Sequence, residues 1–136
     1  VEELVKEASA AKVIGIGETG LDYYYEHSPR AEQQKLFRIH IAAARQLDLP
    51  VIVHSRDADE DTVKILAEEM QKAPFKFLIH CFSSTKYLAE KSVELGGYIS
   101  LSGILTFKKS EAIQDVAKEL PLDRILVETD APYLAP

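Results

Sequence analysis

The chain has 136 residues, of which 46% are hydrophobic and 28% are charged, a composition typical of a globular protein with a hydrophobic core. The 16 lysine and arginine residues against 22 aspartate and glutamate residues give a net charge of −6, which argues against a broad basic surface for nucleic acid. No apolar run approaches the ~20 residues of a membrane span. The single cysteine, Cys81, excludes an internal disulfide, so we expect a reducing, cytoplasmic location.

Short apolar runs alternate with segments of helical periodicity along the whole chain. The runs are apolar on both faces, as in the strands of parallel sheets that helices cover. The longest irregular segment is 23–29. In chain order we predict a helix within 1–11, a strand at 13–17, a helical stripe over 36–47, a strand at 51–53, a helical stripe over 63–70, strands at 77–79 and 98–101, a helical stripe over 113–120 after an N-cap at Ser110, and a strand at 125–127.

This alternation indicates a parallel α/β fold, either a doubly wound open sheet or a TIM (β/α)8 barrel. Residues 15–20 match the pattern G-x-G-x-x-G, but 21–25 do not look like the helix that must follow in a dinucleotide-binding fold. We therefore favour the barrel. A barrel normally needs ~250 residues, so we expect 1–136 to form a single domain covering roughly the middle five βα units.

Four of the apolar runs end in residues of metal-ligand type. Glu18 ends the first run, His54 the second and His80 the third, while Glu128 and Asp130 follow the fifth. One such histidine alone more often caps a helix or bonds a carbonyl. In a barrel, however, the carboxyl ends of all strands meet at one mouth. Four residues of ligand type at that one place favour metal binding over four separate structural roles. Imidazole and carboxylate together suit a divalent ion.

Other residues near the predicted mouth carry competing interpretations. Arg56 forms either a salt bridge or a bidentate contact with phosphate, and we favour the phosphate contact. Lys108 either reaches a substrate phosphate or lies on a solvated surface. Asp57 with Glu60 resembles a helix-capping arrangement, and a serine at 83–84 is expected to begin the next helix.

The sequence also gives expectations for two further histidines, the cysteine and a run of three tyrosines. His40 lies in an apolar helical stripe and is expected to pack with its polar atoms satisfied, whereas His27 is expected to be exposed. Strand alternation after His80 predicts that Cys81 points away from the mouth as a core residue. The tyrosines of 23–25, beside Asp22, either offer a base-stacking surface or pack the long loop.

Five segments in order and spacing resemble the signature blocks of the TatD family, metal-dependent deoxyribonucleases of the amidohydrolase-like superfamily. They cover essentially the whole chain: Gly17–Tyr23, Pro50–Ala58, His80–Ser83, Tyr98–Ser100 with Ser102–Gly103, and Glu128–Pro136.

The resemblance implies a TIM barrel with one or two divalent ions at its mouth, Mg²⁺ foremost and Mn²⁺ or Zn²⁺ as alternatives. It implies that Glu18 is a shared metal carboxylate, that His54 and His80 are metal ligands, and that Asp130 is the metal aspartate. Asp130 and Glu18 are then the expected catalytic residues, with Asp130 orienting or deprotonating the attacking water.

Family members act as exonucleases on DNA, commonly from the 3′ end, so single-stranded DNA or a 3′ end is the expected substrate. Arg56, Asp22 and Lys108 are our candidates for substrate contacts. We expect no membrane and no obligate protein partner.

The chain departs from the family pattern at both ends. It contains no His-x-His pair, with which the family's first strand begins, and no segment after the final block, so we expect a fragment without the first and last strands. Two other functions remain open. One is an amidohydrolase-type hydrolase of an amide or ester, including aminoacyl-tRNA deacylation. The other is a non-catalytic truncated fragment that retains the ligands.

Overall fold

Five parallel strands form one sheet, in which each strand pairs with the next one along the chain, in the order β1-β2-β3-β4-β5. The structure is a computed structural model that describes all of residues 1–136. The elements are α1 (Glu2–Ala8), β1 (Ile16–Asp22), α2 (Arg30–Leu47), β2 (Val51–Arg56), α3 (Asp59–Lys72), β3 (Phe77–Ile79), α4 (Lys86–Glu94), β4 (Tyr98–Leu101), the 3-10 helix η1 (Gly103–Thr106), α5 (Glu111–Glu119), the 3-10 helix η2 (Leu122–Arg124) and β5 (Ile125–Val127).

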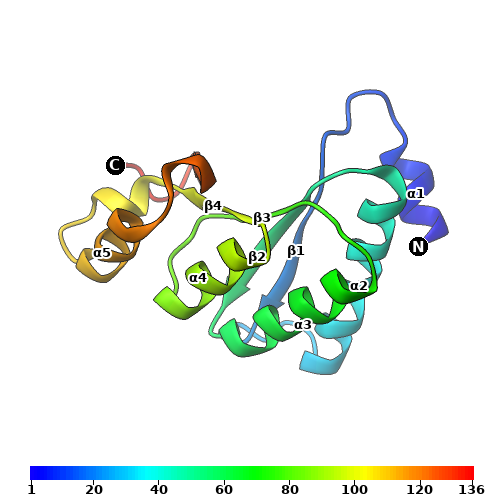
Figure 1. Cartoon of the computed structure of the whole chain (residues 1–136), viewed down its shortest axis with the longest axis horizontal. Coiled ribbons are helices and arrows are strands. Elements are labelled where there is room, and N and C mark those ends of the chain that lie inside the picture. The colour runs from blue at the N-terminus through cyan, green and yellow to red at the C-terminus, as the bar shows by residue number, and fades with distance from the viewer.

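A helix lies between each pair of consecutive strands, and consecutive helices touch one another. Figure 1 shows α2, α3 and α4 on the same side of the sheet, with α5 beyond α4 and the two termini at opposite ends of the molecule. A doubly wound sheet would reverse its strand order and carry helices on both faces. The sequential order with helices on one side is that of a barrel wall. None of the helices is both long and apolar enough to cross a membrane.

The core fills the space between the sheet and these helices. It consists of 20 buried apolar residues in one cluster. Phe37 and Ile41 of α2 and Leu66 of α3 are fully buried, and they pack in the same cluster as Val53 of β2 and Ile79 of β3. Burial of each such side chain contributes about 1.5–3 kcal/mol, so these contacts hold α2 and α3 against the sheet.

The predicted strands at 77–79, 98–101 and 125–127 coincide with β3, β4 and β5, but the first two strand predictions are wrong in their bounds. β1 begins at Ile16 and continues to Asp22, and β2 continues to Arg56, because the two backbones stay paired as far as Asp22 and Arg56. Glu18 and His54 therefore lie inside paired strands rather than after them. Apolar composition does not mark these bounds, since Ile14 is 84% exposed before the strand begins and the fully buried Leu21 lies beyond the apolar run.

An extra residue in β1 bends this part of the sheet. Ile16 pairs with Val51 and Thr19 with Val53, so Gly17 and Glu18 together lie opposite a single residue of β2. This two-against-one arrangement is a β-bulge, which re-aims the side chains that it carries. A Cβ atom at position 17 would lie 2.6 Å from the Ile52 Cβ, so the bulge needs glycine there.

Two predicted helix starts are also wrong. Asp57 adopts a left-handed φ of 52°, and α3 begins after Ala58 without a side-chain cap. The serines at 83–84 precede the true N-cap of α4, Thr85, whose hydroxyl accepts a hydrogen bond from the Leu88 amide at 3.4 Å. Ser110 does precede α5, as predicted, although its side chain makes no capping bond.

A buried carboxylate joins α2 to α3. The Glu69 side chain is 5% exposed and lies 3.0 Å from Arg38 Nη1, 3.5 Å from Arg45 Nη2 and 2.5 Å from Lys72 Nζ. Burial raises the pKa of Glu69, but the hydrogen bonds and charges of Lys72 and Arg38 outweigh it, so the pKa lies below its ordinary value. The ionised form is therefore the one that the folded state stabilises.

We expect Glu69→Gln to lower the free energy of unfolding by about 1.5–3 kcal/mol at pH 7, the range for a hydrogen bond to a charged group. A lowered folded-state pKa gives a contribution that is complete above the ordinary glutamate pKa and is lost as the pH falls through the folded-state pKa. The difference between native and variant, measured by urea unfolding, should therefore shrink in acid. Glu68→Gln is the control, because Glu68 is 41% exposed and should cost less than about 1 kcal/mol. Equal losses from the two variants would contradict this account.

Candidate metal centre

Glu18 lies between two imidazole rings at one rim of the sheet. Its Oε1 is 2.9 Å from His54 Nδ1, and its Oε2 is 4.0 Å from His80 Nε2. The same His80 Nε2 lies 3.3 Å from Asp130 Oδ1. The four side chains that the sequence places at strand ends are thus brought together, from β1, from β2 and from the segments after β3 and β5.

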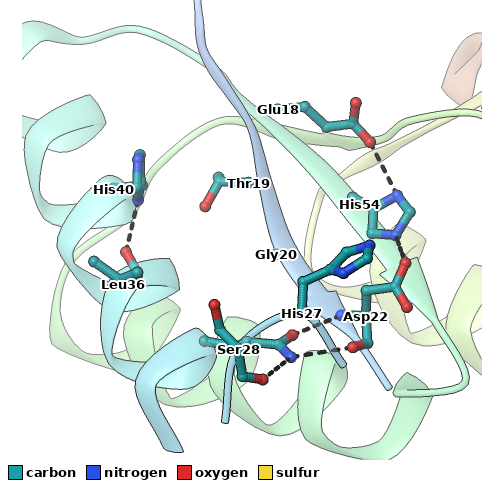
Figure 2. Close-up of a pocket in the computed structure, with 10 residues that line it drawn as sticks. Glu18, Thr19, Gly20, Asp22, His27, Ser28, Leu36, His40 and His54 are labelled. Atoms are coloured by element: carbon teal, nitrogen blue, oxygen red, sulfur yellow. Dashed lines mark hydrogen bonds and ion pairs between the residues drawn. The ribbon is translucent and has the colours of Figure 1, made fainter. Parts of the chain in front are cut away.

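Each imidazole is held from behind by a second carboxylate. His54 Nε2 lies 2.9 Å from Asp22 Oδ2, a contact visible in Figure 2, and His80 Nδ1 lies 2.7 Å from Glu128 Oε2. The nitrogens that remain, Nδ1 of His54 and Nε2 of His80, face Glu18. Metal-ligating histidines nearly always donate their other ring N–H to a carboxylate, carbonyl or water, which fixes the ring and its tautomer.

The supporting carboxylates are themselves fixed by the backbone. Asp22 Oδ1 accepts hydrogen bonds from the Tyr24 amide at 3.0 Å and the Tyr25 amide at 2.8 Å. Glu128 Oε1 accepts one from the Cys81 amide at 2.6 Å. Partial burial raises the pKa of Asp22, but the bonds from the Tyr25 amide and from His54 outweigh it, so the pKa lies below its ordinary value. Asp22 is therefore an ionised acceptor for the His54 ring.

Close approach of the first two strands keeps His54 beside Glu18. Gly20 has a φ of +143°, and a Cβ atom there would lie 1.9 Å from the His54 carbonyl oxygen. A side chain at position 20 would push β1 away from β2. On the other side of His54, the His80 amide donates to the Val53 carbonyl at 2.8 Å, so the end of β3 is tied to β2.

A cavity of about 540 Å³ opens in front of these side chains. It is polar, and Arg56 is the one lysine or arginine in its wall. The lining residues are Glu18, His54, Ser55, Arg56, Asp57, His80, Cys81, Ser83, Ser84, Ile104, Asp130 and Leu134.

The chemical types of these side chains suit a divalent ion, although no three of them are arranged in this structure so that they could coordinate one ion together. The imidazoles and carboxylates are instead paired with one another at hydrogen-bond distance. The imidazole nitrogens of this set suit Zn²⁺ or Mn²⁺, and its carboxylates suit Mg²⁺ or Mn²⁺. Glu18 is 49% and Asp130 38% exposed, so both carboxylates can turn toward an ion without disturbing the core.

Cys81 lines this cavity, and the prediction that it points away from the mouth is wrong. β3 ends at Ile79 and Cys81 has a left-handed φ of 43°, so strand alternation no longer applies there. Its Sγ lies 3.1 Å from Ser102 Oγ. Burial raises the pKa of the Cys81 thiol, and the negative charges of Asp130 and Glu128 raise it further. The thiol is therefore neutral at pH 7.

Only one of the three residues predicted to contact substrate lines this cavity. Arg56 is exposed and lines the cavity, with its Cζ 4.2 Å from the centre of the Tyr24 ring. Both carboxylate oxygens of Asp22 are engaged within the protein, which makes Asp22 a positioning residue for His54. Lys108 is exposed after η1 and is not part of the cavity wall.

The contact of Glu128 with the His80 ring is the feature of this site that sequence reasoning missed. The sequence shows Glu128 only as part of the polar run after the fifth strand, two residues before Asp130. The available signal was the spacing of Glu128 and Asp130, because residues two apart in an extended segment point to the same side, and Glu128 could therefore have been placed near the same ring as Asp130. The contact between Glu128 and His80 Nδ1 depends on the side-chain geometry, which cannot be read from a single sequence.

A second cavity, of about 400 Å³, lies on the side of β1 next to α2. It shares Glu18 and His54 with the first cavity, and Figure 2 shows these two side chains together with Asp22, His27 and His40, which also line it. His40 is half-buried and its Nδ1 lies 2.7 Å from the Leu36 carbonyl oxygen, so it is satisfied as predicted. His27 is exposed, also as predicted.

The chain is similar in sequence and in fold to known proteins. The family described as TatD related DNase matches residues 1–136. A protein of Escherichia coli K12 named "Uncharacterized metal-dependent hydrolase YcfH" is 49% identical over 136 residues, covering 100% of this chain and 51% of the relative. A protein of Pectobacterium atrosepticum named "3'-5' ssDNA/RNA exonuclease TatD" is 34% identical over 136 residues, covering 99% of this chain and 52% of the relative.

Solved structures of this family have the same fold as the chain. The crystal structure of YjjV, a TatD homologue from Escherichia coli K12, matches with a TM-score of 0.87 and 34% identity, over 98% of this chain and 51% of that one. The five-stranded parallel sheet is thus part of the barrel of this family. The chain spans about half the length of the relatives that it matches.

We expect Glu128→Gln to weaken Mn²⁺ binding by about 10- to 100-fold, the usual effect of removing a carboxylate behind a metal-ligating histidine. The amide can no longer fix the His80 ring as a charged acceptor does. Isothermal titration calorimetry with Mn²⁺ measures the change. Glu94→Gln, on the exposed end of α4, is the control and should bind as the native chain does. Unchanged affinity in Glu128→Gln would remove the positioning role of Glu128.

Proposed function

Since this chain belongs to the TatD related DNase family over its whole length, we propose that its protein is a metal-dependent hydrolase that cleaves phosphodiester bonds in DNA, as an exonuclease on single-stranded DNA or 3′ ends. The observation that carries the proposal is the placement of Glu18 between His54 and His80, with each ring supported from behind by a carboxylate. The name of the Pectobacterium relative supports the nuclease activity.

Glu18, His54, His80 and Asp130 are the residues that would hold one or two divalent ions, with Mg²⁺ foremost and Mn²⁺ or Zn²⁺ as alternatives. When bound, such an ion supplies an activated water at neutral pH and neutralises charge on the phosphate. The two rings enter this set through Nδ1 of His54 and Nε2 of His80, because their other nitrogens are engaged by Asp22 and Glu128.

Asp130 is the residue best placed to take a proton from the attacking water. Its Oδ1 faces His80 Nε2 at 3.3 Å, while its other oxygen makes no hydrogen bond within the protein. Asp130 lines the cavity and is partly exposed, so water reaches it. A carboxylate within hydrogen-bond reach of the attacking water serves as its general base.

Arg56 favours a phosphate substrate over a neutral ester or amide. Its guanidinium is the one permanent positive charge in the cavity wall, and its planar fork matches two non-bridging phosphate oxygens. In that position it would stabilise the charge that develops on the phosphoryl group. The net charge of −6 favours a short contact with a strand end over extended binding to duplex DNA.

We expect Asp130→Asn in the intact protein to lower the rate of single-stranded DNA hydrolysis by at least about 100-fold, the typical contribution of a general base. The amide cannot accept the proton, while the fold, measured by circular dichroism and thermal unfolding, should be unchanged. The assay follows shortening of a 5′-labelled oligonucleotide in Mg²⁺, with EDTA as the metal-free condition. Asp115→Asn is the control, because Asp115 is exposed on α5 and pairs with Lys118.

Turnover in Asp130→Asn equal to that of the native chain would contradict the role of Asp130. Cleavage of a generic ester without cleavage of DNA would favour the amidohydrolase-type alternative. Mn²⁺ binding without any hydrolysis by the native chain would favour the non-catalytic one.

A further inference from the structure

We propose that Tyr24, Tyr25 and His27, together with Arg56, form a stacking platform for an unpaired base of single-stranded nucleic acid, next to the metal cavity. The inference rests on the proposed function, because it assigns a base subsite to the same substrate. It concerns residues that lie outside the histidine and carboxylate cluster.

The rings of this platform are exposed and ordered relative to one another. Tyr24 is 59% and Tyr25 56% exposed. The Tyr24 and Tyr25 ring centres are 4.8 Å apart with planes at 88°, and the His27 ring is parallel to that of Tyr25, at 2° and 5.5 Å. Exposed aromatic rings are the surfaces on which proteins stack the bases of single strands.

Packing of the long loop, the competing explanation for this tyrosine run, accounts for Tyr23 alone. The Tyr23 ring is partly buried against the core, and its hydroxyl donates to Asp61 Oδ2 at 2.6 Å. Gln34 donates to the same hydroxyl at 2.8 Å. Tyr23 therefore anchors the segment, and the next two tyrosines remain on the surface without contributing to the core cluster.

Arg56 links the platform to the cavity. It lines the cavity wall, and its Cζ lies 4.2 Å from the centre of the Tyr24 ring and 5.1 Å from that of Tyr25. A guanidinium can lie flat on an aromatic ring while its N–H groups bind phosphate in its own plane. A nucleotide whose phosphate reaches Arg56 would thus bring its base to the tyrosine pair.

Asp22 fixes the platform and the histidine cluster to each other. One carboxylate oxygen holds His54 at 2.9 Å, and the other accepts the amides of Tyr24 and Tyr25. The turn that carries the two rings is therefore held by the carboxylate that orients a proposed metal ligand.

The occupant that fits is a single strand. The bases of a duplex are paired and stacked on their neighbours, whereas an unpaired base has a free face for the platform. Every base has such a face, so the platform should tolerate all four bases. Stacking also supplies affinity that does not depend on positive charge, which matters in a chain whose net charge is −6.

The test compares two oligonucleotides of equal phosphate number, hexathymidylate and its abasic counterpart, both with phosphorothioate linkages that resist hydrolysis. Binding to the native chain is measured by calorimetry in Mg²⁺. We expect hexathymidylate to bind at least about fivefold more tightly, the lower end of one base stacked on an aromatic side chain. Tyr24→Leu and Tyr25→Leu should each lose most of that advantage and leave abasic binding unchanged.

Two controls separate stacking from damage to the fold. Tyr24→Phe keeps the ring and should bind hexathymidylate as the native chain does. Tyr87→Leu removes a ring that is 45% exposed on α4, outside the cavity wall, and should have no effect. Thermal unfolding of every variant checks that the exposed substitutions leave the fold intact.

Equal binding of the two oligonucleotides by the native chain, or native-like hexathymidylate binding by both leucine variants, would overturn the platform. Cleavage assays run in parallel keep the two proposals distinguishable. Metal-dependent hydrolysis of DNA without a base-dependent affinity would leave the nuclease function standing and remove the platform. Base-dependent affinity that the leucine variants lose, without any hydrolysis, would support the platform and remove the nuclease function.

Discussion

The hydrogen bonds from Asp22 to His54 and from Glu128 to His80 are the interactions on which the site depends. Without them each imidazole could rotate about its side-chain bonds and present either nitrogen to the cavity. With them, one nitrogen of each ring faces Glu18, and the two rings share a common carboxylate. The chemistry that we propose uses this fixed orientation, because a carboxylate behind a metal-ligating histidine sets the tautomer and the orientation of its ring.

The backbone provides these bonds through three local features. The bulge at Gly17 and Glu18 turns Glu18 toward the rim, and the close contact at Gly20 keeps β1 against β2. The turn after β1 donates two amides to Asp22, which leaves the other oxygen for His54. The positive φ at Cys81 brings its amide to Glu128. Each feature lies where a strand ends or is irregular, which is where a barrel wall can carry function without loss of its core.

Charge is distributed unevenly around this rim. Carboxylates surround the two histidines, while Arg56 supplies the one permanent positive charge of the cavity wall. An acidic cluster of this kind binds a cation more readily than a bare phosphate, so the anionic substrate that we propose depends on the ion and on Arg56 for its attraction. The exposed tyrosine pair beside Arg56 adds an uncharged surface, which suits the base rather than the backbone of a nucleotide.

Sequence alone determined the order of strands and helices along the chain, the bounds of β3 to β5, and the four side chains that come together at one rim of the sheet, because hydrophobic periodicity and the topology of parallel sheets set all three. Only the tertiary structure decided that β1 and β2 extend to Asp22 and Arg56, since strand pairing there involves the backbone and leaves polar side chains exposed. It also decided that Asp22 and Glu128 support the rings and that Cys81 enters the cavity. Those outcomes depend on backbone angles and side-chain rotamers at the ends of strands, which a pattern of apolar residues does not encode.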